Sequence, residues 1–134
     1  ASITTHKALN QINQIGFKYA MSPFYDESML IKAKKIGQLL IPGVLSPSEI
    51  HKAIEFQCKL LKIFPATMFG INYLNQLKTS FHSLPFLIAA GGLKPNDLDA
   101  WLKTGYNSII LGRSILKNDI IDPSLISWLE KYSA

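Results

Sequence analysis

The amino-acid sequence predicts an α/β domain built around a sheet of parallel strands. Five short apolar runs recur along the chain, and each ends in glycine, proline or serine. Continuous apolar runs of this length are typical of parallel strands buried on both faces. The ends of successive runs lie about 20 to 30 residues apart, the size of a strand-helix unit with short loops. A chain of 134 residues with 48% hydrophobic content can bury its own core, so we expect a single domain over residues 1–134.

The predicted strands occupy residues 17–21, 38–41, 60–64, 86–89 and 108–111. Their carboxyl ends are marked by Ser22, Pro42, Pro65, Gly91 and Gly112. In open parallel sheets and in barrels alike, ligands bind at the carboxyl ends of the strands. Candidate functional residues are therefore expected at these positions and directly beside them.

Helix signals lie between the strands. Ser46, Pro47 and Glu49 have the spacing of a capping box, which predicts a helix that runs on to Cys58. Lys32, Lys34 and Lys35 close an earlier predicted helix, where the helix dipole favours cations.

Two further helices are predicted near the end of the chain. One opens at Pro95, stops at Gly105, and carries Leu98, Trp101 and Leu102 on one face. The last begins near Asp122-Pro123 and is expected to point Leu125, Ile126 and Leu129 inward. Trp101 and Trp128 are interpreted as residues that pack helices onto the sheet.

Five strand-helix units fit two architectures. One is an open doubly wound sheet, which five strands complete. The other is a (β/α)8 barrel, which needs at least about 200 residues, so this chain would hold only about five of its eight strands. The strand pattern alone does not choose between them.

Composition argues against several classes of function. The net charge of +5 is not concentrated in a basic patch, so no nucleic-acid partner is expected. No apolar run reaches the roughly 18 residues that span a bilayer, and the first residues do not form a signal peptide. The single cysteine, Cys58, fits a reducing compartment, so we expect a cytoplasmic protein. His6, His51 and His82 share no metal-ligand spacing, and no metal site is expected.

Lys62 lies inside the apolar strand 60–64. Burial disfavours the ammonium form and lowers the pKa of a lysine, and the neutral amine is the form that attacks a carbonyl carbon. The alternative is a structural lysine whose stem lies along the strand while its head reaches solvent. Gly91 and Gly92 carry a similar ambiguity, because paired glycines either let N–H groups approach an anion or form a tight turn.

Five short motifs follow one another along the chain. They are Met21-Ser22-Pro23, Ile41-Pro42-Gly43, Lys62-Ile63-Phe64-Pro65-Ala66, Ala89-Ala90-Gly91-Gly92-Leu93 and Leu111-Gly112-Arg113-Ser114. In order and spacing they resemble the motifs of the 2-keto-3-deoxy-6-phosphogluconate / 4-hydroxy-2-oxoglutarate aldolase family. In that family the lysine-x-phenylalanine-proline-alanine motif carries the Schiff-base lysine.

This resemblance implies a partial (β/α)8 TIM barrel, with about five parallel strands that correspond to strands 4–8, the C-terminal two-thirds of an aldolase barrel. It implies a carbon-carbon lyase of carbohydrate metabolism that cleaves a 2-keto-4-hydroxy acid to pyruvate and an aldehyde. No metal or organic cofactor is implied, and the usual assembly is a homotrimer. Lys62 is the implied catalytic residue, with Pro23, Phe64 and Ser2 at the substrate. The residues implied to bind the substrate phosphate are Gly91, Gly92, Gly112, Arg113 and Ser114.

The chain also departs from the family pattern. No residue matches the family's general acid/base glutamate or its substrate-binding arginine, and Glu49 is expected to serve the capping box instead. The resemblance places residues 1–3 at the end of the third strand, so the earlier strands are expected to be absent. Arg113 stands where the family has a glycine, and it either adds a phosphate contact or obstructs the backbone approach.

Three functional readings follow. The first is a Schiff-base aldolase for 2-keto-3-deoxy-6-phosphogluconate or 4-hydroxy-2-oxoglutarate. The second is an incomplete or non-catalytic homologue that keeps the lysine and the phosphate-binding loops. The third is another phosphate-binding barrel enzyme, or an open-sheet protein, with similar glycine loops. In each case five strands alone would leave two sheet edges unpaired, and we expect association or an open, curved sheet.

Overall fold

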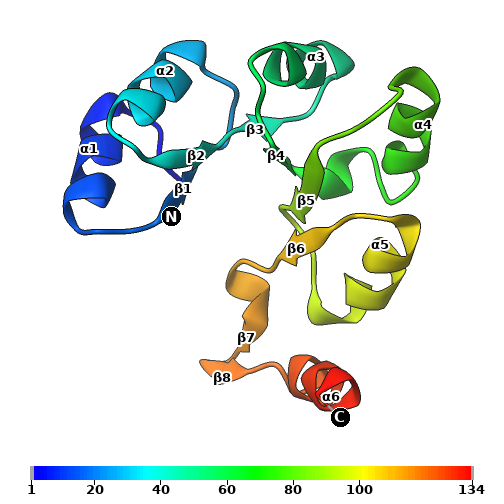
Figure 1. Cartoon of the computed structure of the whole chain (residues 1–134). Helices are drawn as coiled ribbons and strands as arrows, with labels where there is room; N and C mark the ends of the chain where they lie inside the picture. Colours follow the sequence, from blue (N-terminus) through cyan, green and yellow to red (C-terminus); the bar gives the residue numbers. More distant parts are fainter. Residues whose placement is uncertain (1, 134) are drawn as a thin grey trace. The chain divides into compact units, whose positions relative to one another are not determined.

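The computed structural model describes residues 2–133, and the chain divides into two compact units. The first unit consists of residues 1–64 and 84–87, and the second of residues 65–83 and 88–134. Figure 1 labels the elements of both units in chain order. Within residues 2–133, no helix combines the length and the apolar character that crossing a bilayer requires.

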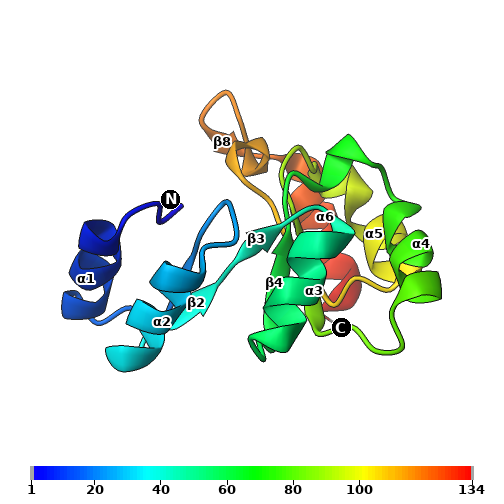
Figure 2. The ribbon, with the colours of Figure 1, turned by 90° about the horizontal axis from the view of Figure 1, so that it is seen from above.

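The first unit alternates strands with helices. Its elements are α1 (His6–Gln14), β1 (Tyr19–Met21), α2 (Glu27–Lys35), β2 (Leu39–Ile41), β3 (Gly43–Val44), α3 (Pro47–Glu55) and β4 (Leu60–Ile63). β1 pairs in parallel with β2, with Tyr19 opposite Leu39. Figure 2 shows β2 leading directly into β3, and β3 pairs in parallel with β4, with Gly43 opposite Lys62.

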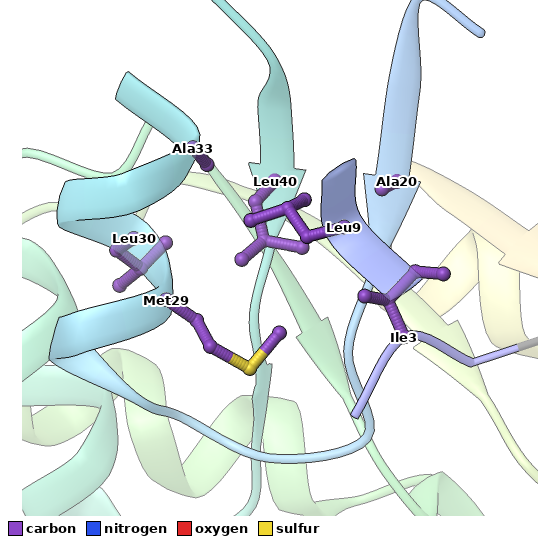
Figure 3. Close-up of a cluster of buried hydrophobic side chains, with 7 residues drawn as sticks. All are labelled: Ile3, Leu9, Ala20, Met29, Leu30, Ala33 and Leu40. Carbon is purple, nitrogen blue, oxygen red and sulfur yellow. The ribbon is translucent and has the colours of Figure 1, made fainter. Parts of the chain in front are cut away.

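A hydrophobic core fills the space between the first two helices and the first two strands (Figure 3). Its buried members are Ile3, Leu9, Ala20, Met29, Leu30, Ala33 and Leu40. α1 and α2 contact each other, and Leu9 on α1 has no solvent-exposed surface. Full burial of a leucine-sized side chain contributes about 1.5–3 kcal/mol, so this cluster holds the two helices against β1 and β2.

The second unit continues the pattern of strand and helix. Its elements are η1 (Ala66–Met68), α4 (Tyr73–Ser80), η2 (Pro95–Asp97), α5 (Leu98–Thr104), β6 (Ser108–Ile110), η3 (Arg113–Ile115), β7 (Leu116–Lys117), β8 (Ile120–Ile121) and α6 (Pro123–Tyr132). β5 (Phe86–Ala90) begins in the first unit and ends in the second. Its later residues pair in parallel with β6, and the strand order of this sheet is β3-β4-β5-β6.

The predicted α/β class with parallel strands is confirmed. All five predicted strands are present, and the second of them is continued past Pro42 by β3. The capping box is formed at the start of α3, where Ser46 and Glu49 bond each other's backbone N–H groups. α5 ends at Gly105, whose φ of 111° is in the left-handed region that glycine favours.

Three sequence predictions need correction. α3 ends at Glu55, so Cys58 lies in the link to β4 and is only half-buried. The short antiparallel hairpin of β7 and β8 was not predicted, although Asn118 and Asp119 at its turn are residue types that favour the positive φ observed there. Ile126 and Leu129 are 44% and 50% exposed instead of pointing inward. The reason is the rotation of α6, whose Trp128 side bonds to Asp99 of α5 and leaves the isoleucine side uncovered.

Candidate active site

Lys62 is a buried lysine in the middle of a buried strand. On β4 its neighbours Leu61 and Ile63 have no exposed surface, and Lys62 itself is 4% exposed. Successive strand residues point to opposite faces, so both faces of β4 are covered. A structural lysine whose amine reaches solvent would be more exposed than Lys62 is.

Phe64 is the aromatic neighbour of the Lys62 amine. The Nζ atom lies 4.8 Å from the centroid of the Phe64 ring, within the range of a cation-π interaction. Among the described residues, no carboxylate forms an ion pair with Lys62. Burial lowers the pKa of Lys62 below its ordinary value of 10.5, because the ammonium form loses its hydration. A larger share of neutral amine is therefore present at a given pH than for a surface lysine.

Gly43 brings the turn after β1 to the same face of the sheet as Lys62. The two residues lie opposite each other in the β3–β4 register, and laterally paired residues project to the same face. A Cβ atom on Gly43 would lie 2.5 Å from the carbonyl oxygen of Pro23 and 2.8 Å from the nitrogen of Phe24. Glycine is therefore required there, because the Pro23 backbone occupies the space over β3.

The turn that carries Pro23 is fixed from within. Ser22 is 1% exposed, and its hydroxyl donates a hydrogen bond of 2.6 Å to the carbonyl oxygen of Phe24. Its N–H donates to the carbonyl oxygen of Ile41 across the strand pair. These bonds hold Pro23 at the carboxyl end of β1.

Ser2 lies beside this strand end but is exposed. The next residue, Ile3, is buried, and its N–H donates to the carbonyl oxygen of Met21 at 2.8 Å. The segment at residues 2–3 therefore lies alongside the last residue of β1.

Glu49 is committed to the start of α3. Its Oε2 accepts hydrogen bonds from the N–H groups of Leu45 and Ser46 and from the Ser46 hydroxyl, at 2.8–3.0 Å. Burial alone would raise the pKa of Glu49, but these bonds outweigh it and hold the pKa below the ordinary value. A carboxylate that is held in its ionised form by three hydrogen bonds is poorly suited to exchange protons, which agrees with the predicted capping role.

The second unit contains the predicted phosphate loops. Gly91 and Gly92 have φ angles of 96° and 81°, so the paired glycines form a left-handed turn after β5. The turn is joined to the segment after β6, because the Ser114 hydroxyl donates to the carbonyl oxygen of Leu93 at 2.6 Å. Gly112 and Arg113, which precede Ser114, are exposed. Arg113 makes no ion pair within the described residues.

The structure thus gathers the predicted residues into two groups, one in each unit. Lys62, Phe64 and Pro23 belong to the first, with Ser2 near the end of β1. The glycine turn and residues 112–114 belong to the second. Sequence reasoning missed two contributors: the contact that Gly43 permits and Thr67, which contacts the glycine turn. A glycine inside a strand signals a close backbone approach, whereas nothing in the local sequence singles out Thr67.

Several known proteins with similar sequences or structures are aldolases. The chain is 27% identical to a 2-dehydro-3-deoxy-6-phosphogalactonate aldolase of Escherichia coli, over 81% of this chain and 53% of that protein. It resembles a 2-keto-3-deoxy-6-phosphogluconate aldolase structure from Zymomonas mobilis with a TM-score of 0.80 at 19% identity, over 99% of this chain and 65% of that one. A Legionella pneumophila KDPG aldolase, solved with pyruvate captured as a covalent carbinolamine, matches with a TM-score of 0.73 at 25% identity, over 80% and 52% of the two chains.

The chain spans only part of its relatives. Its matches cover between 45% and 63% of the length of four curated aldolases. Across its own length the match is nearly complete, because the family model described as KDPG and KHG aldolase covers residues 1–129. On that match, together with the barrel-like fold of its structural relatives, the chain belongs to the KDPG and KHG aldolase family.

Proposed function

We propose that this chain acts as a class I aldolase polypeptide, in which the Lys62 amine forms a Schiff base with a 2-keto acid. The substrate is 2-keto-3-deoxy-6-phosphogluconate or 4-hydroxy-2-oxoglutarate, and the products are pyruvate and an aldehyde. The observation that carries the proposal is the state of Lys62, which is 4% exposed, lacks a carboxylate partner among the described residues and has a lowered pKa. Such an amine is activated as a nucleophile by desolvation.

The bonds change as follows. The neutral amine adds to the C2 carbonyl, and loss of water from the carbinolamine gives the imine. The imine accepts the electron pair of the breaking C3–C4 bond, while a base removes the proton of the C4 hydroxyl. An aldehyde leaves, and the remaining enamine is protonated at C3 and hydrolysed to pyruvate and free Lys62.

The proton transfers in this scheme need a general acid/base, and no residue of this chain is assigned to that role. Glu49 is tied to the start of α3, and the chain spans about half the length of several relatives. A general acid/base contributes about 10²–10⁴-fold to a rate. The second candidate is therefore an incomplete homologue, which forms the imine but turns over slowly or not at all.

The glycine turn and the Arg113 segment are proposed to bind the phosphate of the substrate. Exposed N–H groups in a left-handed turn attract anions, and Arg113 adds a cation that no described carboxylate neutralises. This favours the phosphorylated keto acid over the unphosphorylated one. A single domain, a homotrimeric assembly and a cytoplasmic location complete the proposal.

Trapping with pyruvate and borohydride tests the Schiff base directly. The reduced adduct is expected on Lys62 alone, located by mass spectrometry of peptides. The Lys62→Met variant should lose it, whereas Lys59→Met, which removes an exposed lysine three residues away, should retain it. The absence of an adduct, or an adduct on another lysine, would contradict the proposal.

Proton transfer separates the two candidates. In D2O a competent acid/base exchanges the methyl protons of enzyme-bound pyruvate, and proton NMR follows their loss. A trapped adduct together with rapid exchange and retro-aldol cleavage indicates the aldolase. A trapped adduct without either indicates the incomplete homologue.

A further inference from the structure

Two hydroxyl groups from other segments of the second unit donate hydrogen bonds to the backbone around Gly91 and Gly92. The Thr67 Oγ1 atom donates to the carbonyl oxygen of Gly91 at 3.1 Å. The Ser114 Oγ atom donates to the carbonyl oxygen of Leu93 at 2.6 Å. The side chain of Leu93 is 2% exposed and anchors the turn in the core.

These bonds fix the orientation of two peptide planes. A trans peptide is rigid, and its N–H points away from its C=O. The bond from Thr67 therefore sets the direction of the Gly92 N–H. The peptide after Leu93 is held at both ends, because the N–H of Lys94 donates to Asp97 at 2.7 Å.

Between these two fixed peptides Gly92 is exposed, whereas Leu93 is buried. Within the described residues, the N–H groups of Gly92 and Leu93 donate no hydrogen bond. Thr67 also fills the place of a side chain at position 92, since a Cβ there would lie 3.0 Å from Thr67 Cγ2. The turn is thus closed on the Thr67 side, and the N–H group of the exposed Gly92 is left for a ligand.

We propose that Thr67 and Ser114 form a hydroxyl clamp that holds this turn and positions the N–H group of Gly92 for the substrate phosphate. Thr67 is a positioning residue that no motif assigned, and Ser114 acts through Leu93 instead of binding the anion with its own hydroxyl. This inference rests on the proposed anion-binding role of these loops. The proposed Schiff base on Lys62 is tested by a separate experiment.

Titration of the full chain with inorganic phosphate, followed by ³¹P NMR or calorimetry, tests the clamp. Thr67→Val keeps the shape and removes the hydroxyl, and Thr67→Ser keeps the hydroxyl. One hydrogen bond of ordinary strength corresponds to about two- to tenfold in affinity. Thr67→Val and Ser114→Ala should each weaken phosphate binding by that factor, whereas Thr67→Ser and Ser114→Thr should bind like the unmodified chain.

Thr104→Val is the matched control, because its hydroxyl bonds only within α5. It should bind phosphate normally, and thermal unfolding of every variant reports its folding. Equal binding by Thr67→Val and the unmodified chain would overturn the clamp, as would weaker binding by Thr67→Ser or no binding by the unmodified chain. Pyruvate trapping on the unmodified chain, measured in parallel, reports the fate of the Schiff-base proposal independently.

Discussion

Burial of Lys62 makes the amine reactive and also costs stability. An ammonium group removed from water is unfavourable unless it is paired, and a cation-π contact such as that with Phe64 returns only about 0.5–2 kcal/mol. The reactivity of the amine and the loss of stability both arise from burial of Lys62, so both should disappear when the amine is removed.

Lys62→Met is expected to abolish the pyruvate adduct and to raise the melting temperature. The pKa of Lys62 is lowered in the folded chain, so the unfolded chain binds more protons between that pKa and 10.5. Stability of the unmodified chain therefore rises with pH through this window. The advantage of Lys62→Met should be greatest below the folded-state pKa of Lys62 and should shrink as the pH rises from there to 10.5. Melting curves from pH 7 to pH 11 measure it, and a methionine variant that is less stable at neutral pH would contradict this account.

Gly43→Ala is expected to destabilise the fold and to slow imine formation. The new methyl group would overlap the backbone of Pro23 and displace the turn that Ser22 and Phe24 close. Overpacking of this kind costs about 1–3 kcal/mol. Gly112→Ala is the control for the clash, because it adds the same methyl group to a glycine where nothing lies within 4 Å of the Cβ position. Denaturant unfolding and pyruvate trapping should separate the two variants, and equal stabilities would refute the steric explanation.

At the scale of elements, the sequence predicted what local chemistry controls. The five strands follow from apolar runs, and the start of α3 follows from Ser46 and Glu49. The orientation of α6 was wrong because it depends on Asp99, which lies 29 residues before Trp128. Hydrophobic spacing shows which residues share a helix face. It does not show which face turns toward a carboxylate that is distant in the sequence.

Asp99 on α5 accepts hydrogen bonds from three donors on α6, and these bonds hold the two helices together. The donors are the Trp128 indole N–H at 2.6 Å, the Lys131 ammonium at 2.8 Å and the Tyr132 hydroxyl at 3.0 Å. These donors, the Lys131 hydrogen bond foremost, lower the pKa of Asp99 to about 2. The contribution to stability is present above the ordinary carboxyl pKa of 3.8 and is lost as the pH falls through about 2.

Asp99→Ala is therefore expected to loosen α6 at neutral pH, with faster hydrogen exchange along residues 123–132. Asp99→Asn should give a smaller effect because one acceptor oxygen remains. Lys131→Met should also give a smaller effect than Asp99→Ala, because the Trp128 and Tyr132 donors to Asp99 remain and exposed ion pairs contribute little. In the unmodified chain, the protection of α6 amides relative to their intrinsic exchange rate should be lost only near pH 2. Equal exchange in all four proteins at pH 7 would remove Asp99 from this role.

At the scale of the whole molecule, the site was predictable to the extent that strand ends were. Lys62, Pro23 and the glycine turn were predicted as site residues because parallel strands carry ligands at their carboxyl ends, and their roles stay predictions. Thr67 was not found, because its contact with Gly91 joins residues 24 positions apart and leaves no local trace. Glu49 was correctly kept out of the site because the capping box is a local pattern.

The described surface carries more exposed apolar side chains than isolated positions explain. In the second unit they gather along the β7–β8 hairpin and α6, at Ile115, Leu116, Ile120, Ile121, Ile126 and Leu129, which are 37–69% exposed. Groups of exposed apolar side chains are typical of surfaces that bind other chains. We therefore expect the chain to self-associate at micromolar concentration and above.

Ile120→Asp combined with Ile126→Asp should shift this equilibrium toward the monomer by introducing charge where apolar surface is covered. Ile31→Asp is the control, because Ile31 is 41% exposed on α2, away from that patch in the sequence and in the other unit. Light scattering across a hundredfold range of concentration measures the mass of each protein. Since Ile120 and Ile126 lie outside the first unit, which contains Lys62, pyruvate trapping of the double variant tests whether association is needed for imine formation. A monodisperse monomer with a high melting temperature for the unmodified chain would show that the patch is tolerated in water and that the association prediction is wrong.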